Sequence, residues 1–144
     1  MNRTFQIGNG TDTSLRFTRD DEQGFTDYGL EARLQGVTLQ DSSMWFDHPE
    51  QFIAAFAEFE RSRCGAATLT ATPQFMLTTE PDGSTGGVWV SFSFCREHYL
   101  GPSQSSAIHR GGITMKGGFA LPGEIIAKTL EDFRHFFSDA TNVA

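Results

Sequence analysis

Apolar and polar residues alternate most regularly between residues 88 and 95. One side of this stretch carries Val88, Val90, Phe92 and Phe94, and the other carries Trp89, Ser91, Ser93 and Cys95. A repeat of two is typical of a β-strand, and Val, Phe and Trp suit a pleated, half-buried surface. The pattern therefore predicts a central strand of a sheet, with its Val and Phe side facing the core.

Shorter alternating stretches on both sides of this strand predict the rest of a sheet. They cover residues 4–7, 14–18, 28–34, 37–39, 68–72, 74–79 and, interrupted by glycines, 107–119. Gly36 separates two of these stretches and indicates either a tight connection or a bulge. Inward and outward sides are cleanly separated, as in antiparallel strands that are wet on one face, so we expect an antiparallel sheet.

Two stretches have a helical repeat instead. The first begins at Asp47-His48-Pro49-Glu50, where Asp47 is placed to cap a helix and Pro49 to open it. The second begins at Leu121-Pro122-Gly123-Glu124. Apolar stripes follow both starts, with Phe52, Ile53, Phe56 and Phe59 in the first and Ile125, Ile126, Leu130, Phe133, Phe136 and Phe137 in the second. We expect two amphipathic helices, at about 49–63 and 122–138, packed on the sheet.

The order of these elements favours an α+β fold with a mainly antiparallel sheet. Strands cluster before each helix and do not alternate with helices one for one, as they would in a parallel sheet. A chain of 144 residues has the usual size of one domain and can bury a core. We therefore expect residues 1–144 to form a single α+β domain. The strand order and the sheet face covered by the helices stay open.

Charge limits the class of partner. The chain has 18 acidic and 11 basic residues, a formal net charge of -7, which repels nucleic-acid phosphates and anionic membranes and favours a basic protein. No apolar run approaches a membrane span, and the first ten residues hold no apolar signal region. We expect a cytoplasmic protein. Cys64 and Cys95 are then reduced thiols.

Catalytic and metal-binding motifs are not evident. Cys95 and His98 have the spacing of two zinc ligands, but the chain offers no second short-spaced pair. Glu31 and Asp41 lie on the polar side of their strands, where acids are common. The glycine-rich segments lack the spacing and the lysine of a phosphate loop. We name no catalytic residue, metal ligand or cofactor, and the sequence favours a non-enzymatic protein over an enzyme.

Five residues are candidates for contact with a partner protein. Trp89 and Trp45 are named because tryptophan dominates binding hot spots. Trp89 is preferred, since it projects from the serine-bearing side of its strand. Asp20, Asp21 and Glu22 form an acidic stretch suited to a basic partner.

The helix openings His48-Pro49-Glu50-Gln51-Phe52 and Leu121-Pro122-Gly123-Glu124-Ile125 stand in a layout of strands, helix, strands and helix. This layout resembles small uncharacterised bacterial proteins that include immunity proteins of polymorphic-toxin systems. The resemblance implies a bacterial, non-enzymatic protein of the immunity type, or another protein-binding module, that acts through an acidic surface. It assigns no role to any single residue.

A second hypothesis belongs to a different class. A small-ligand-binding or enzymatic domain would place its site between the sheet and the helices, in a Phe-lined cavity. Glu97, His98 and His109 are the side chains that would converge there. The oligomeric state stays open, and a structural or oligomeric module is a third alternative.

Overall fold

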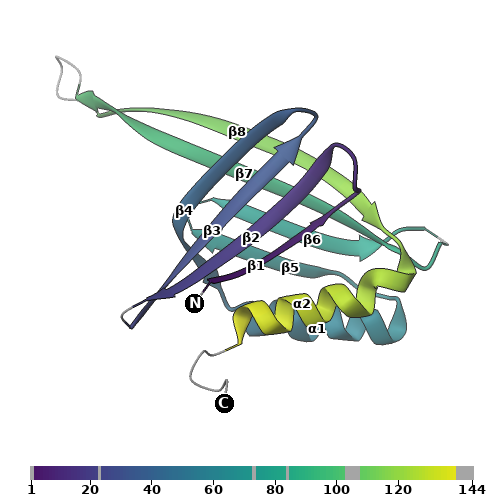
Figure 1. Cartoon of the computed structure of the whole chain (residues 1–144). Helices are drawn as coiled ribbons and strands as arrows, with labels where there is room; N and C mark the ends of the chain where they lie inside the picture. The colour runs from purple at the N-terminus through teal and green to yellow at the C-terminus, as the bar shows by residue number, and fades with distance from the viewer. Residues whose placement is uncertain (1, 23, 73, 84, 103–107, 139–144) are drawn as a thin grey trace.

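The computed structural model describes residues 2–22, 24–72, 74–83, 85–102 and 108–138, of which 97–102 and 108–111 are described by their backbone. The described residues form one antiparallel sheet, two α-helices and a short 3-10 helix (Figure 1). The elements are β1 (Asn2–Gly8), β2 (Thr13–Glu22), β3 (Phe25–Leu34), β4 (Val37–Asp47), α1 (Pro49–Ser62), β5 (Ala67–Thr72), β6 (Phe75–Pro81), β7 (Val88–Pro102), β8 (Ile108–Leu121), η1 (Gly123–Ile125) and α2 (Ile126–Phe137). The predicted α+β class and both predicted helices are confirmed.

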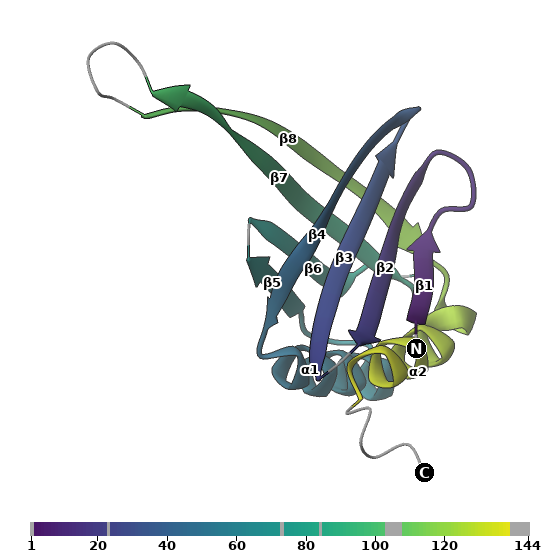
Figure 2. The same cartoon turned by 60° about the vertical axis from the view of Figure 1, so that its left-hand side comes forward.

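The strands follow one another through the sheet in chain order, from β1 to β8, and the sheet bends at β4. The last residues of β4 leave β3 and pair with β5, with Trp45 opposite Thr72. A bulge precedes this change, because Leu30 pairs with Asp41 whereas Tyr28 pairs with Met44. Bulges bend and twist a strand. The half made of β1 to β4 therefore folds over the half made of β5 to β8 (Figure 2).

Gly36 belongs to a tight turn. Gln35 and Gly36 connect β3 to β4 with φ angles of 49° and 85°. Two positive φ angles in a two-residue connection match the twist of an antiparallel hairpin. Of the two alternatives that the sequence left open at Gly36, the tight connection is therefore correct. The bulge lies further along β4, where Ser43 has a φ of 55°.

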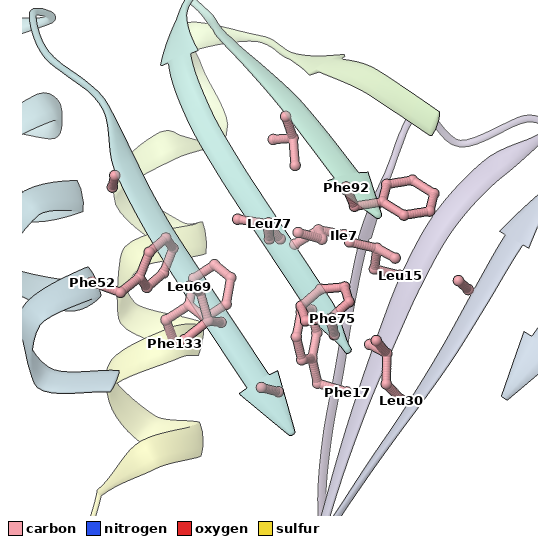
Figure 3. Close-up of a cluster of buried hydrophobic side chains, with 14 of the residues drawn as sticks. Ile7, Leu15, Phe17, Leu30, Phe52, Leu69, Phe75, Leu77, Phe92 and Phe133 are labelled. Atoms are coloured by element: carbon pink, nitrogen blue, oxygen red, sulfur yellow. The ribbon is translucent and has the colours of Figure 1, made fainter. Parts of the chain in front are cut away.

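The inner faces of both halves of the sheet and the two helices enclose one Phe-rich core (Figure 3). The predicted inward side of β7 is at most 4% exposed. The ring of Phe133 in α2 meets Phe5 and Phe52 edge to face, with 4.9 Å between the centroids in both pairs. Edge-to-face packing is a favoured geometry for aromatic rings. The helices thus cover the face of the sheet that carries Val88 and its neighbours.

The start of α1 differs from the prediction in its cap. The helix begins at Pro49, but Asp47 is the last residue of β4 and its Oδ2 accepts a hydrogen bond from the Thr70 hydroxyl at 3.3 Å. Pairing of β4 with β5 holds Asp47 opposite Thr70, so its carboxylate faces the strand and not the helix. His48 takes the cap position with a φ of 48° and makes no side-chain cap bond. Neither described helix is long and apolar enough to cross a membrane.

Strand β7 is longer than the hydrophobic pattern predicts, since it continues past residue 95 to Pro102, whereas β8 nearly matches the predicted stretch 107–119. Their pairing continues from Cys95 opposite Thr114 to Pro102 opposite Ile108, and this hairpin projects from the body as an arm (Figures 1 and 2). Glycines and polar residues interrupt the apolar alternation here, although the backbone ladder does not need that alternation to continue. The side chain of Arg96 ties the base of the arm to β4 by donating to the carbonyl of Gln40 at 3.1 Å.

Two buried arginines cap the end of α2. Arg3 Nη1 donates to the carbonyls of His135 at 3.0 Å and Ser138 at 2.7 Å. Arg19 Nη1 donates to the carbonyls of Phe136 and Ser138, each at 2.8 Å. Positive charge is favoured at a helix C-terminus, where the last carbonyls have no partner within the helix. The two arginines therefore fasten α2 to β1 and β2.

Candidate functional site

Aromatic side chains gather at the end of the molecule where the β2–β3 hairpin, the end of β4 and the end of α2 meet. Phe25 is 74% exposed and Trp45 is 62% exposed. Together with the half-buried Tyr28 and Phe137 they line a hollow of about 500 Å³, which Arg19 also borders. We call the four aromatic residues, Phe25, Tyr28, Trp45 and Phe137, the aromatic end.

The local structure explains why these rings face solvent. Met44 and Phe46 are buried, so Trp45 between them must point to the other side of β4. Phe25 is the first residue of β3, directly after Gly24, whose φ of 89° belongs to the turn. Phe137 is the last residue of α2.

Tyr28 connects the exposed rings to the core. Its ring centroid lies 5.2 Å from that of Phe46, 5.9 Å from that of Phe137 and 6.4 Å from that of Trp45. Burial raises the pKa of the Tyr28 phenol, so the ring stays neutral at physiological pH. The aromatic end therefore rests on a packed base, which lowers the entropy cost of using it for binding.

Arg19 and Asp21 form a polar pair beneath the rings. The Arg19 guanidinium carbon lies 5.4 Å from the Tyr28 ring centroid, and Arg19 Nε donates to Asp21 Oδ1 at 3.1 Å. Asp21 Oδ1 also accepts a hydrogen bond from the Thr26 hydroxyl at 2.6 Å. This bond, followed by the contact with Arg19, lowers the pKa of the Asp21 carboxyl. Asp21 thus serves the internal structure of this end.

The other acids of the hairpin lie beside Phe25. Glu22 is the cross-strand partner of Phe25, and Asp20 is the cross-strand partner of Asp27. Directly opposite residues of an antiparallel pair share one face of the sheet. We call Asp20, Glu22 and Asp27 the acidic rim.

The sequence-predicted contact residues divide between two places. Trp45, Asp20, Asp21 and Glu22 lie at the same end of the molecule. Trp89 lies on β7, opposite Glu80 and Ala120, in the other half of the sheet. Phe25 was not among the predicted residues. Its signal was a large apolar residue directly after an acidic stretch and a glycine, where the alternating pattern had stopped.

Trp89 has a packing role on its strand. A Cβ placed on Gly118 of β8 would lie 2.7 Å from Cζ2 of Trp89, so the indole covers the glycine. Trp89 is accordingly 38% exposed, less than Trp45. Aromatic rings on one strand commonly shield a glycine on the next. Of the two tryptophans, Trp45 offers the more accessible ring.

Glu31 and Asp41 line a different hollow, of about 330 Å³, on the outer face of the half formed by β1 to β4. Arg16 lies opposite Glu31 in the register and lines the same hollow, as does Arg96. Asp41 Oδ1 accepts a hydrogen bond from the Ser42 amide at 2.8 Å. Arginines thus accompany both acids, and Asp41 helps to shape the bulge.

The hypothesis of a site between sheet and helices gains no support. Within the described ranges, no group of three His, Cys, Asp or Glu side chains is arranged to hold a metal ion. The backbones of Glu97, His98 and His109 lie on the arm, away from the helices, and their side chains are outside the described residues (Figure 2). The space between sheet and helices holds the Phe rings of the core.

Comparisons with protein-family models, with curated proteins and with solved structures found no match.

Proposed function

We propose that this chain is a non-enzymatic protein-binding module that contacts its partner through the aromatic end. The exposure of Phe25 and Trp45, at 74% and 62%, is the observation that carries the proposal. Exposed apolar patches with polar rims mark interaction sites, and aromatic residues in such patches supply most of the binding energy. A partner that covers both rings removes this apolar surface from water, which favours the complex.

The acidic rim supports a basic partner. Asp20, Glu22 and Asp27 lie on the face that carries Phe25, and the whole chain has a formal net charge of -7. Complementary charge raises association rates and disfavours partners of the wrong sign. An apolar centre with a charged margin is the usual composition of an interface.

A role as an immunity protein is the narrower form of this proposal. A basic toxin would be neutralised if the aromatic end covered the surface that the toxin needs for activity. We expect the gene to lie directly downstream of a toxin gene, and we expect co-expression to protect cells from that toxin. A variant with Phe25→Ser should protect less at equal abundance.

Site-specific photo-crosslinking tests the proposed function. A benzophenone amino acid replaces Phe25 in one protein and Met76, which is 50% exposed on β6, in a matched control. In cells of the source organism, position 25 should crosslink to one protein in stoichiometric yield, and position 76 should not. The purified pair should then bind directly, and Phe25→Ser should weaken binding by about tenfold or more.

Crosslinking that is absent at position 25, or equal at positions 25 and 76, contradicts the proposal. Phe25 is exposed, so Phe25→Ser should leave the unfolding temperature of the free protein unchanged. A large fall in that temperature would mean that weaker binding results from misfolding and not from the lost contact. In that case Trp45→Ser replaces it as the test variant.

A further inference from the structure

The aromatic end already binds one guanidinium of its own chain. Arg19 is 6% exposed, and its guanidinium lies over the ring of Tyr28, within the range of a cation–π contact. The position is fixed by the carbonyls of Phe136 and Ser138 and by Asp21. A cation of the chain itself therefore already lies against the inner side of the aromatic end.

The two exposed rings of the aromatic end, Phe25 and Trp45, have no such cation. In the part of the chain that the structure describes, no arginine or lysine lies over the ring of Phe25 or Trp45. Both rings border the same hollow as Arg19 and Tyr28. The face of an indole is the strongest cation–π acceptor among the aromatic side chains. A second cation therefore has an accessible place at Trp45.

Arginines lie near part of the acidic rim, since Arg3, Arg16 and Arg19 border the same hollow as Asp20 and Asp27. Among the described residues, Asp20, Glu22 and Asp27 form no ion pair, whereas Asp21 pairs with Arg19. Asp20 and Asp27 face each other directly in the register, and like charges opposite each other destabilise a strand pair. Asp20 Oδ1 is buried and has no hydrogen-bond partner. A positively charged donor at the exposed carboxylates of Glu22 and Asp27 would offset the repulsion between the like charges.

We infer that the partner presents a basic segment whose arginine side chain stacks on Trp45 and Phe25 and donates hydrogen bonds to the acidic rim. This inference rests on the proposed function and specifies the chemistry of its site. Arginine fits better than lysine, because its planar guanidinium stacks on rings and binds a carboxylate with two parallel bonds. A purely apolar anchor would bury the acidic rim without pairing it, which is costly.

Small probes test this chemistry without knowledge of the partner. The full chain with Trp89→Phe retains Trp45 as its single tryptophan, because the sequence has two. The indole N–H resonance of Trp45 is followed during titration with the amides of N-acetylarginine, N-acetyllysine and N-acetylcitrulline. Citrulline keeps the shape of arginine but has no charge.

The arginine probe should bind about 2- to 5-fold more tightly than the citrulline probe, the range for an exposed cation–π contact. Phe25→Ala and Asp27→Asn should each reduce this preference, and Met76→Ala, on the other half of the sheet, should leave it unchanged. Added salt should weaken the arginine probe and leave the citrulline probe unaffected.

Two results overturn the inference. Equal binding of the arginine and citrulline probes excludes a cation, and equal binding of the lysine and arginine probes excludes guanidinium stacking as the basis of recognition. Neither result affects the crosslinking at position 25, so a failed inference and a failed proposed function are distinguishable.

Discussion

At the scale of single residues, two arginines hold the first two strands, β1 and β2, against the C-terminal helix α2. Arg3 and Arg19 are each 6% exposed, and each donates its Nη1 to carbonyls at the end of α2. Both lie just outside the predicted strands 4–7 and 14–18, and the sequence showed them only as charged residues, which are usually exposed. Their partners are carbonyls more than 100 positions away along the chain. A local pattern of residues in the sequence cannot reveal contacts between positions so far apart.

Replacement of Arg3 by Met should lower the free energy of unfolding by about 2 to 3 kcal/mol, the usual worth of hydrogen bonds to a charged group. The carbonyls of His135 and Ser138 lose their donor, and the C-terminus of α2 loses a favourable charge. Urea unfolding followed by circular dichroism measures the change. Arg16→Met, at an exposed position of β2, is the control and should cost less than about 0.5 kcal/mol. Equal losses in the two variants would show that the cap contributes nothing.

Asp21 should make stability depend on pH. Hydrogen bonds from Thr26 and Arg19 lower its pKa in the folded protein below the ordinary value of 3.8. A carboxyl with a lowered folded pKa stabilises the fold above its unfolded pKa, and this contribution disappears as the pH falls through the folded pKa. Below about pH 4, wild type should therefore lose stability more steeply than Asp21→Asn. Urea midpoints measured between pH 2.5 and 6 test this, and parallel curves for the two proteins would contradict it.

At the scale of whole elements, hydrophobic periodicity predicted the strand and helix faces that form the core. It missed features that depend on hydrogen bonds alone. The inward side of β7 and most of the stripes of α1 and α2 are buried as expected, because burial imposes an apolar repeat on the sequence. Ile53, Ile125 and Phe137 of those stripes are half-buried. The extension of β7 beyond Cys95 was missed because the apolar alternation stops there, while the backbone pairing with β8 continues. The Asp47 cap was wrong because a strand pair with β5 competes for the same side chain.

The arm should be dispensable for the fold of the body. Among the described side chains of this hairpin, the buried ones nearest the arm are Phe94 and Met115, and Ile113 is 57% exposed. Residues 97–112 can be replaced by Asn-Gly, because Arg96 and Ile113 are directly opposite and suit a two-residue turn. The free energy of unfolding should change by less than about 1 kcal/mol in urea titrations. Loss of cooperative unfolding would instead make the arm part of the folding unit.

At the scale of the molecule, the sequence predicted the class of the fold but not its assembly. Clusters of strands before each helix indicated an antiparallel α+β domain, which the structure has. The bend depends on a bulge in β4 between Asp41 and Met44, and a one-residue bulge leaves little trace in the pattern. This bend allows Trp45 to come near Phe137 and the β2–β3 hairpin. The aromatic end is thus a product of tertiary structure, so only its parts were visible in the sequence.

The most direct test compares the two tryptophans of the chain. Titration calorimetry with the partner identified by crosslinking should give at least about tenfold weaker binding for Trp45→Ser, because Trp45 lies in the aromatic end. Trp89→Ser should bind as tightly as wild type, since Trp89 covers Gly118 on the other half of the sheet. Unchanged affinity for Trp45→Ser, with loss for Trp89→Ser, would contradict the assignment of the binding surface.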